Sequence, residues 1–228
     1  MEFKSTNSSI FPEPVSRLLK SLSSVAFFEE SVLIGSWVMP LYREFFSVSY
    51  TLRTLDIDFA VQLLPGKRSS KTDLHELIIS QGFAPFLTQS GVEKFSKEGF
   101  SIEFIAHRRG GRDEDPVFIT NWNISAIPLP FVDILIDSSF VARFPEYIVR
   151  APLPEAFFFH KLITAERRRE QTKRAKDLEQ CAAIAPHLDQ DKLRIVCKSV
   201  KLGPGTRSAI RSSCKAIDFP PQFFGLKE

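Results

Sequence analysis

The chain changes character near Arg150, where short apolar runs give way to segments with helical spacing. Upstream, residues 31–34 and 57–63 are apolar runs of the length expected for buried strands. Downstream of the Pro-rich stretch at 152–154 the strand pattern stops. Helices are expected there over 155–171, 173–187, 189–201 and 206–217. The sequence therefore predicts an α+β protein in two parts.

We place the boundary at the Pro-rich stretch, which gives an α/β domain over residues 1–150 and a C-terminal helical domain over residues 151–228. The remaining elements expected upstream are helices over 12–28, 37–46 and 72–81, and a hairpin of 93–95 with 100–106 that turns around Lys97-Glu98-Gly99. Segment 131–137 is apolar and too short for its periodicity to decide between strand and helix.

Composition limits the class of protein. With 228 residues, 43% of them hydrophobic and 22 of them Phe, the chain has enough apolar surface to fold, so disorder is excluded. A net charge of +3 does not mark a dedicated nucleic-acid binder. The three cysteines form no Cys-x-x-Cys pair, and no apolar run is long enough to span a bilayer. We expect a cytoplasmic protein with reduced thiols and no membrane association.

Two acids stand two residues apart, at Asp56 and Asp58, in the second predicted strand. Their carboxylates point to one face and repel each other, a situation that a hard cation such as Mg²⁺ relieves. Glu103, on the next predicted strand, would add a third carboxylate. The alternative is an exposed strand face with solvated acids. The apolar residues Ile57 and Phe59 favour the metal site, because they anchor the opposite face of the strand.

A Gly-Ser pair, Gly35-Ser36, ends the first predicted strand and begins a helix. Such a turn brings backbone N–H groups close to a phosphate, and the helix dipole favours negative charge there. An ordinary turn with a serine helix cap is the simpler interpretation of the pair taken alone.

Three stretches of the sequence, taken together, resemble the polymerase-beta-like nucleotidyltransferase superfamily. They are Ile34-Gly35-Ser36, Arg53-Thr54-Leu55-Asp56-Ile57-Asp58-Phe59 and Ser101-Ile102-Glu103-Phe104. The nearer likeness is to bacterial nucleotidyltransferase-fold proteins close to the abortive-infection toxin group. Downstream, Val149 to Pro154, Phe159-His160-Lys161-Leu162 and Lys176-Asp177-Leu178 look like the helical half of that group. The resemblance covers roughly residues 30–188.

The resemblance implies a mixed sheet flanked by helices, followed by helices, and a Mg²⁺-dependent transfer of NMP from an NTP to a hydroxyl. Two Mg²⁺ ions are implied, with Mn²⁺ as an alternative. Catalysis and metal binding fall to Asp56, Asp58 and Glu103, where the superfamily usually has Asp at the third position. The nucleotide-binding positions implied are Gly35, Ser36, Arg53, Thr54, Lys161, Lys176 and Asp177.

The acceptor is open: RNA, a protein or a small molecule. Basic clusters at 107–112 and 167–176 would contact RNA or protein, although solvated loops and helix ends explain such runs equally simply. A non-catalytic NTP-binding or toxin–antitoxin module that keeps the fold is the main alternative function. A third alternative is an antibiotic-modifying enzyme, for which an acidic acceptor pocket would be expected instead of basic clusters.

Overall fold

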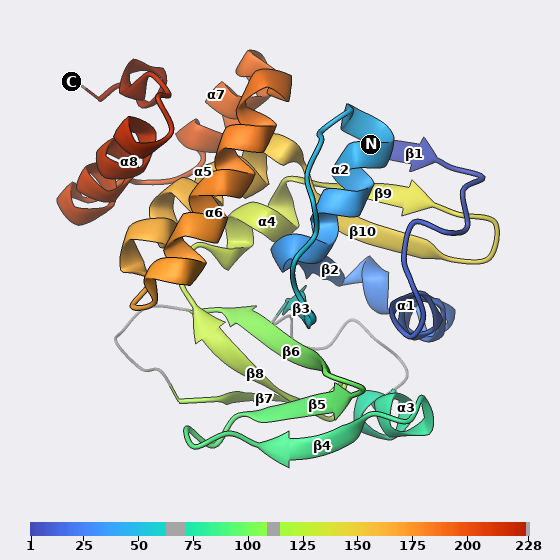
Figure 1. Ribbon diagram of the computed structural model, residues 1–228. Helices are drawn as coiled ribbons and strands as arrows, with labels where there is room; N and C mark the ends of the chain where they lie inside the picture. The colour runs from blue at the N-terminus through green and yellow to red at the C-terminus, as the bar shows by residue number, and fades with distance from the viewer. Residues whose placement is uncertain (63–71, 109–114, 227–228) are drawn as a thin grey trace.

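The computed structural model describes residues 1–62, 72–108 and 115–226 (Figure 1). In these residues the larger sheet has seven strands. Its main order is β2 (Ser31–Ile34), β3 (Asp56–Val61), β6 (Phe100–His107), β5 (Glu93–Lys97) and β4 (Ala84–Leu87), and β6 also pairs with β8 (Ile124–Leu129), which pairs with β7 (Val117–Ile119). The β3–β6 and β6–β8 pairs are parallel and the others are antiparallel, so the sheet is mixed as expected.

A smaller sheet joins the N-terminus to the centre of the chain. Strand β1 (Glu2–Lys4) lies parallel to β9 (Ser139–Arg143), which is antiparallel to β10 (Ile148–Pro152). Helix α1 (Val15–Ser24) lies on the same side of the molecule as this smaller sheet (Figure 1).

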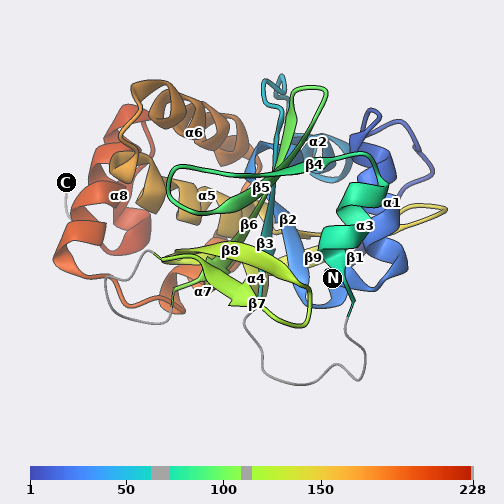
Figure 2. The ribbon, with the colours of Figure 1, turned by 90° about the horizontal axis from the view of Figure 1, so that it is seen from below.

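The helices flank the strands. Helices α5 (Pro154–Thr164), α6 (Gln171–Ile184), α7 (Gln190–Lys198) and α8 (Pro204–Ala216) gather on one side, whereas α1 and α3 (Leu74–Ser80) lie on the other (Figure 2). Helix α2 (Met39–Phe46) follows the first strand of the larger sheet, and α4 (Val132–Asp137) contacts α5. The α+β class, the mixed sheet and the C-terminal helices are all as predicted from the sequence.

Several predicted elements are confirmed closely. The first strand ends at Ile34, Gly35 turns the chain with a φ of +67°, and Pro40 occupies the first turn of α2. The hairpin turns through Glu98 and Gly99, which both have positive φ, as a two-residue turn requires. Three of the four C-terminal helices lie within a few residues of the predicted ranges, whereas the helix predicted over 155–171 ends at Thr164. The undecided segment 131–137 is the helix α4.

Other predictions were wrong in extent. The helix predicted over 12–28 ends at Ser24, because Ala26 adopts the left-handed conformation and a short 3₁₀ helix follows. The second predicted strand begins at Asp56 and ends at Val61; its closing Pro65-Gly66 and Leu63 lie outside the described residues.

The sequence analysis missed strands that are short or contain a breaker, namely β1, β4, β7, β8, β9 and β10. In β8 the misleading residue is Pro128, which lies beside Ala106 in the parallel ladder. Pairing between strands, in the hairpins β4–β5, β7–β8 and β9–β10 and between β1 and β9, rather than local propensity, makes these segments strands.

The apolar core includes residues from both predicted domains. Phe59 of β3 and Phe158 of α5 belong to one buried cluster, and the Tyr42 hydroxyl donates to the carbonyl of Pro152 at 2.8 Å. The division at residue 150 stays a prediction. Among the described residues, no helix has the length and apolar character needed to cross a membrane.

Candidate active site

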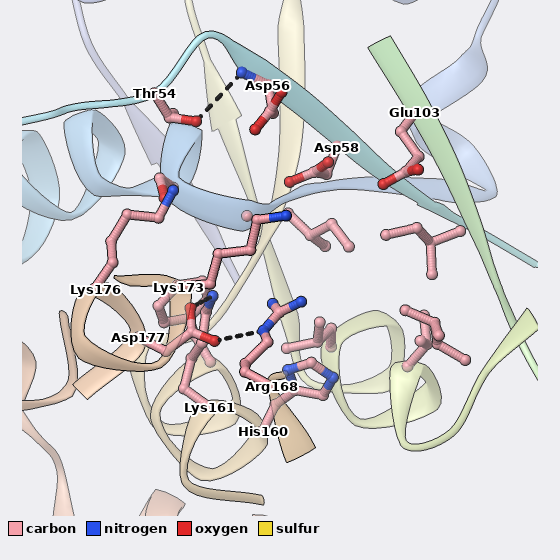
Figure 3. Close-up of a pocket in the computed structure, with 18 of the residues that line it drawn as sticks. Thr54, Asp56, Asp58, Glu103, His160, Lys161, Arg168, Lys173, Lys176 and Asp177 are labelled. Atoms are coloured by element: carbon pink, nitrogen blue, oxygen red, sulfur yellow. Dashed lines mark hydrogen bonds and ion pairs between the residues drawn. The ribbon is translucent and has the colours of Figure 1, made fainter. Parts of the chain in front are cut away.

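Strand register brings the predicted acids together. Strand β3 pairs in parallel with β6, and in that register Asp58 lies beside Glu103 and Asp56 beside Ser101. Neighbouring strands are about 4.8 Å apart and side chains in register share a face, so these three carboxylates form one surface. Ile57 and Phe59 point the other way and are fully buried, as the alternation predicted. We call Asp56, Asp58 and Glu103 the strand wall (Figure 3).

Gly35 lies directly against this wall. A Cβ atom at position 35 would lie 2.2 Å from the Asp58 carboxylate oxygen Oδ2, and the φ of +67° also disfavours a side chain. Asp58 therefore occupies the space that any other residue at position 35 would fill. Strand β2 supports this arrangement, because Ile34 pairs with Asp58 in the antiparallel ladder.

The surroundings of Asp58 alter its ionisation. Burial, together with the charges of Glu103 and Asp56, raises the pKa of Asp58 to about 7, although Lys161 and Lys94 act in the opposite direction. Near neutral pH the metal-free wall is thus only partly ionised at Asp58. In the described residues no group of three or more His, Cys, Asp or Glu side chains is arranged to hold a metal ion as it stands.

Lys94, which the sequence analysis did not single out, joins the strand wall from β5. Its Nζ lies 2.6 Å from Glu103 Oε1, with about a quarter of the lysine side chain and a fifth of the glutamate side chain exposed. In the structure Phe95 pairs with Ile102, and one further step along both strands of the hairpin sets Lys94 opposite Glu103. The third carboxylate is therefore held by an ammonium group.

Cations and one buried acid face the strand wall from α5, α6 and the short segment between them. We call Lys161, Arg168, Lys173, Lys176 and Asp177 the helix wall (Figure 3). Asp177 is 1% exposed and accepts from Lys161 Nζ and, at 2.9 Å, from Arg168 Nε. Burial alone would raise the pKa of Asp177, but these two cations outweigh it and hold that pKa below the ordinary value.

A cavity of about 240 Å³ separates the two walls. Besides the charged groups, its lining includes Gly35, Ser36, Thr54 and Ser101, so it reaches from the Gly-Ser turn to β6. One part is apolar and is formed by Ile34, Ile105, Leu129, Val132, Leu135 and Phe157. The cavity thus offers carboxylates, cations and an apolar surface to a single ligand.

Most of the predicted nucleotide-binding residues line the cavity, but one of them does not. Thr54 lines the cavity and its Oγ1 accepts from the backbone N–H of Asp56 at 3.2 Å, which fixes the start of the acidic strand. Lys176 also lines the cavity, and Lys161 is 6% exposed within it. Arg53 is exposed and is not part of the lining, so the structure does not bring it into the site.

His160 lines the cavity beside Lys161. Burial, reinforced by the charge of Lys161, lowers the pKa of His160 to about 3. The imidazole is therefore neutral near pH 7 and is a poor proton acceptor there.

Only the second of the two predicted basic clusters can be compared with the expectation of an open positive surface, and it differs from that expectation. Most of the cluster 107–112 lies outside the described residues. In the cluster 167–176, Arg168 pairs with Asp177, Lys173 with Glu170 and Arg174 with Glu166. Arg167 packs over the ring of Phe131. Much of this positive charge is therefore balanced within the chain.

Comparison with known proteins identifies the family and the fold. A family model described as Nucleotidyltransferase matches residues 13–199, and the chain belongs to this family. The crystal structure of an antigenic nucleotidyltransferase-like protein from Paracoccidioides brasiliensis shares the fold, with a TM-score of 0.50 and 13% identity over 93% of this chain and 94% of that chain. A search of curated proteins found no match.

Proposed function

We propose that this protein is a Mg²⁺-dependent nucleotidyltransferase that binds an NTP between the strand wall and the helix wall and transfers NMP to a hydroxyl acceptor. One observation carries the proposal: three carboxylates in strand register face several cations across one cavity that begins at a Gly-Ser turn. Anionic phosphates with a hard cation match both walls at once. Membership of the nucleotidyltransferase family supports the same reaction class.

In this proposal the chain's own residues mainly position the reactants. The triphosphate lies against Gly35 and Ser36, with Lys161 and Lys176 neutralising its oxygens from the helix wall. The acceptor oxygen attacks the α-phosphorus, the bond from that phosphorus to the bridging oxygen of the β-phosphate breaks, and pyrophosphate leaves on the Gly35-Ser36 side. The acceptor hydroxyl loses its proton to solvent as the new P–O bond forms, and pyrophosphate keeps the electron pair of the bond that breaks.

The strand wall fits Mg²⁺ on its chemistry. Burial and the charges of Glu103 and Asp56 raise the pKa of Asp58 to about 7, and a divalent cation removes the repulsive part of that cost. Asp56, Asp58 and Glu103 would hold the ion. When bound, Mg²⁺ supplies charge neutralisation for the triphosphate and favours the deprotonated acceptor. For Glu103 to take part, Lys94 must release it.

The acceptor belongs to a class that the site leaves open: an RNA, a protein or a small molecule with a free hydroxyl. On the helix wall, opposite the carboxylates that would hold the metal, the cavity is bordered by cations of the segment 168–176. An anionic acceptor such as RNA is therefore favoured over a cationic aminoglycoside-like molecule.

The test uses each of the four NTPs labelled at the α-phosphate, with Mg²⁺ or Mn²⁺ and a cell extract. We expect one class of macromolecule or small molecule to become labelled while pyrophosphate is released, and Asp56→Ala to abolish both. Asp137→Ala, at an exposed position of α4 outside the cavity, is the control. If wild type neither labels anything nor binds an NTP in a metal-dependent way, the proposal is wrong.

A second function, a non-catalytic NTP-binding or toxin–antitoxin-type module, is supported by one contact. The Lys94 ammonium lies 2.6 Å from Glu103, where a second metal would need this carboxylate. A bound NTP that is never hydrolysed or transferred, with a stoichiometry unaffected by Asp56→Ala, would favour this alternative. The resemblance to the abortive-infection toxin group is part of this second proposal.

A further inference from the structure

Helix α6 directs one of its faces at the candidate site. Lys173, Lys176, Asp177 and Gln180 are spaced by three, one and three residues, which sets them on a single helical face. The first three of these residues line the cavity. Gln180, one turn further on, is fully buried. The family resemblance did not include it.

Gln180 is bonded to the Gly-Ser turn. Its side-chain Nε2 donates to Ser36 Oγ at 2.8 Å, a buried contact between residues 144 positions apart. One amide group therefore ties α6 to the turn.

The direction of this bond decides what Ser36 offers to a ligand. A hydroxyl has one hydrogen to donate, and its oxygen accepts from other groups. Since Ser36 Oγ accepts from Gln180, the Ser36 hydrogen is left to donate elsewhere. Ser36 is 5% exposed and lines the cavity, so a phosphate oxygen in the cavity is a fitting acceptor.

Gln180 is a poor choice for stability alone. Its Oε1 atom is buried and pairs with no group in the described part of the chain, and an unsatisfied buried acceptor destabilises a fold. An apolar side chain of similar shape would fill the same space without that cost. The hydrogen bond that its N–H group donates to Ser36 explains why a buried amide occurs at this place.

We infer that Gln180 is a positioning residue, which holds the Ser36 hydroxyl so that its hydrogen points to a triphosphate oxygen. This inference rests on the proposed function, because it assumes that an NTP occupies the cavity. Gln180 acts through Ser36 and does not itself touch the nucleotide. It couples the helical part of the chain to the phosphate-binding turn.

The experiment is a double-mutant cycle on NTP affinity. Isothermal titration calorimetry with a non-hydrolysable NTP analogue and Mg²⁺ gives Kd for wild type, Gln180→Met, Ser36→Ala and the double variant. We expect Gln180→Met to weaken binding about five- to tenfold, Ser36→Ala by a similar factor, and the double variant by no more than Ser36→Ala alone. The melting temperature of Gln180→Met should be equal to or above that of wild type.

Two further variants sharpen the test. Gln180→Asn keeps an amide that is too short to reach Ser36, so it should weaken binding as Gln180→Met does. Ser213→Ala is the matched control, because this serine is also buried and donates to the carbonyl of Leu162 at 2.9 Å, away from the cavity. It should change stability but leave Kd unchanged.

The outcomes separate the two proposals. Wild type that binds the analogue while Gln180→Met and Gln180→Asn bind it equally well would overturn the inference alone. Losses that multiply in the double variant would do the same, because they show that Gln180 does not act through Ser36. Wild type that binds no NTP at all would overturn the proposed function and this inference with it.

Discussion

The strand wall and the helix wall carry opposite charges, and they balance those charges differently. On the strand wall the carboxylates of Asp56, Asp58 and Glu103 stand in register, and Lys94 pairs with Glu103 alone. On the helix wall Lys161 and Arg168 share the buried carboxylate of Asp177. The pKa of Asp58 is raised to about 7, by burial first and then by like charges, whereas cations hold the pKa of Asp177 below its usual range.

This difference separates two uses of buried charge. On the helix wall Asp177 compensates the charges of Lys161 and Arg168, so breaking this group should damage the fold. The strand wall is strained by like charges until a cation arrives, so relieving it should stabilise the metal-free protein while removing function. Four measurements test this difference between the two walls.

The largest effect is expected from Asp58→Asn on catalysis. Loss of this central carboxylate should lower the rate of pyrophosphate release at least about 1,000-fold, equivalent to about 4 kcal/mol of transition-state stabilisation. Pyrophosphate release in the presence of Mg²⁺ and NTP measures the effect. A rate within tenfold of wild type would show that the strand wall is not the catalytic wall.

The next effect concerns the helix wall and folding stability. Asp177→Asn leaves Lys161 buried without its counter-charge and should lower the free energy of unfolding by about 3–5 kcal/mol. Urea unfolding at pH 7 measures it. The control is Asp191→Asn, which breaks an exposed pair with Arg194 and should cost no more than about 0.5 kcal/mol. Equal losses in the two variants would contradict the comparison.

The third effect is a gain in folding stability instead of a loss, and it depends on pH. Because the pKa of Asp58 is raised to about 7 in the folded protein, the native state holds a proton there that the unfolded chain releases near pH 4. The stability contributed by that proton is full below about pH 4 and is lost as pH rises to about 7.

Asp58→Asn resembles the protonated form at every pH. In metal-free buffer the free energy of unfolding of this variant should exceed that of wild type by an amount that grows by about 2 kcal/mol as the pH rises from 5 to 8. Thermal unfolding at the two pH values measures the difference. A gain that does not grow with pH would mean that Asp58 is not strained by its neighbours.

The smallest effect is expected at Lys94. Removing the ammonium in Lys94→Met frees Glu103 and should strengthen Mn²⁺ binding about fivefold, near 1 kcal/mol. Calorimetric titration with Mn²⁺ in the absence of nucleotide measures it. Lys97→Met on the same strand is the matched control, because this lysine donates to the carbonyl of Gln81 and lies outside the cavity. Weaker Mn²⁺ binding in Lys94→Met would show that the pair supports the metal site.

Much of the fold could be predicted from local patterns. Strand β2, the β5–β6 hairpin and the four C-terminal helices follow from apolar periodicity and from residues that suit positive φ. The strands that were missed have weaker local signals, although β8 and β9 also alternate between more and less buried residues. Strand β8 contains Pro128, and β1, β9 and β10 are short segments that become strands only by pairing with one another.

The site was predictable as a set of residue types but not as an arrangement. Asp56, Asp58 and Glu103 were chosen from alternation, and Lys161, Lys176 and Asp177 from a family resemblance. Arg53 came from the same resemblance and lies outside the cavity. Lys94 and Gln180 were missed, although hairpin register and helical spacing pointed to them, because neither residue type suggests chemistry by itself.

The sequence by itself determined which face each of the paired acids points to, because side chains alternate along a strand whatever surrounds it. It also determined the turn at Gly35, since positive φ favours glycine. Only the tertiary structure decided that Glu103 lies beside Asp58, that α6 faces them, and that Gln180 reaches Ser36. Those facts depend on strand order and helix packing, which join residues far apart in the chain.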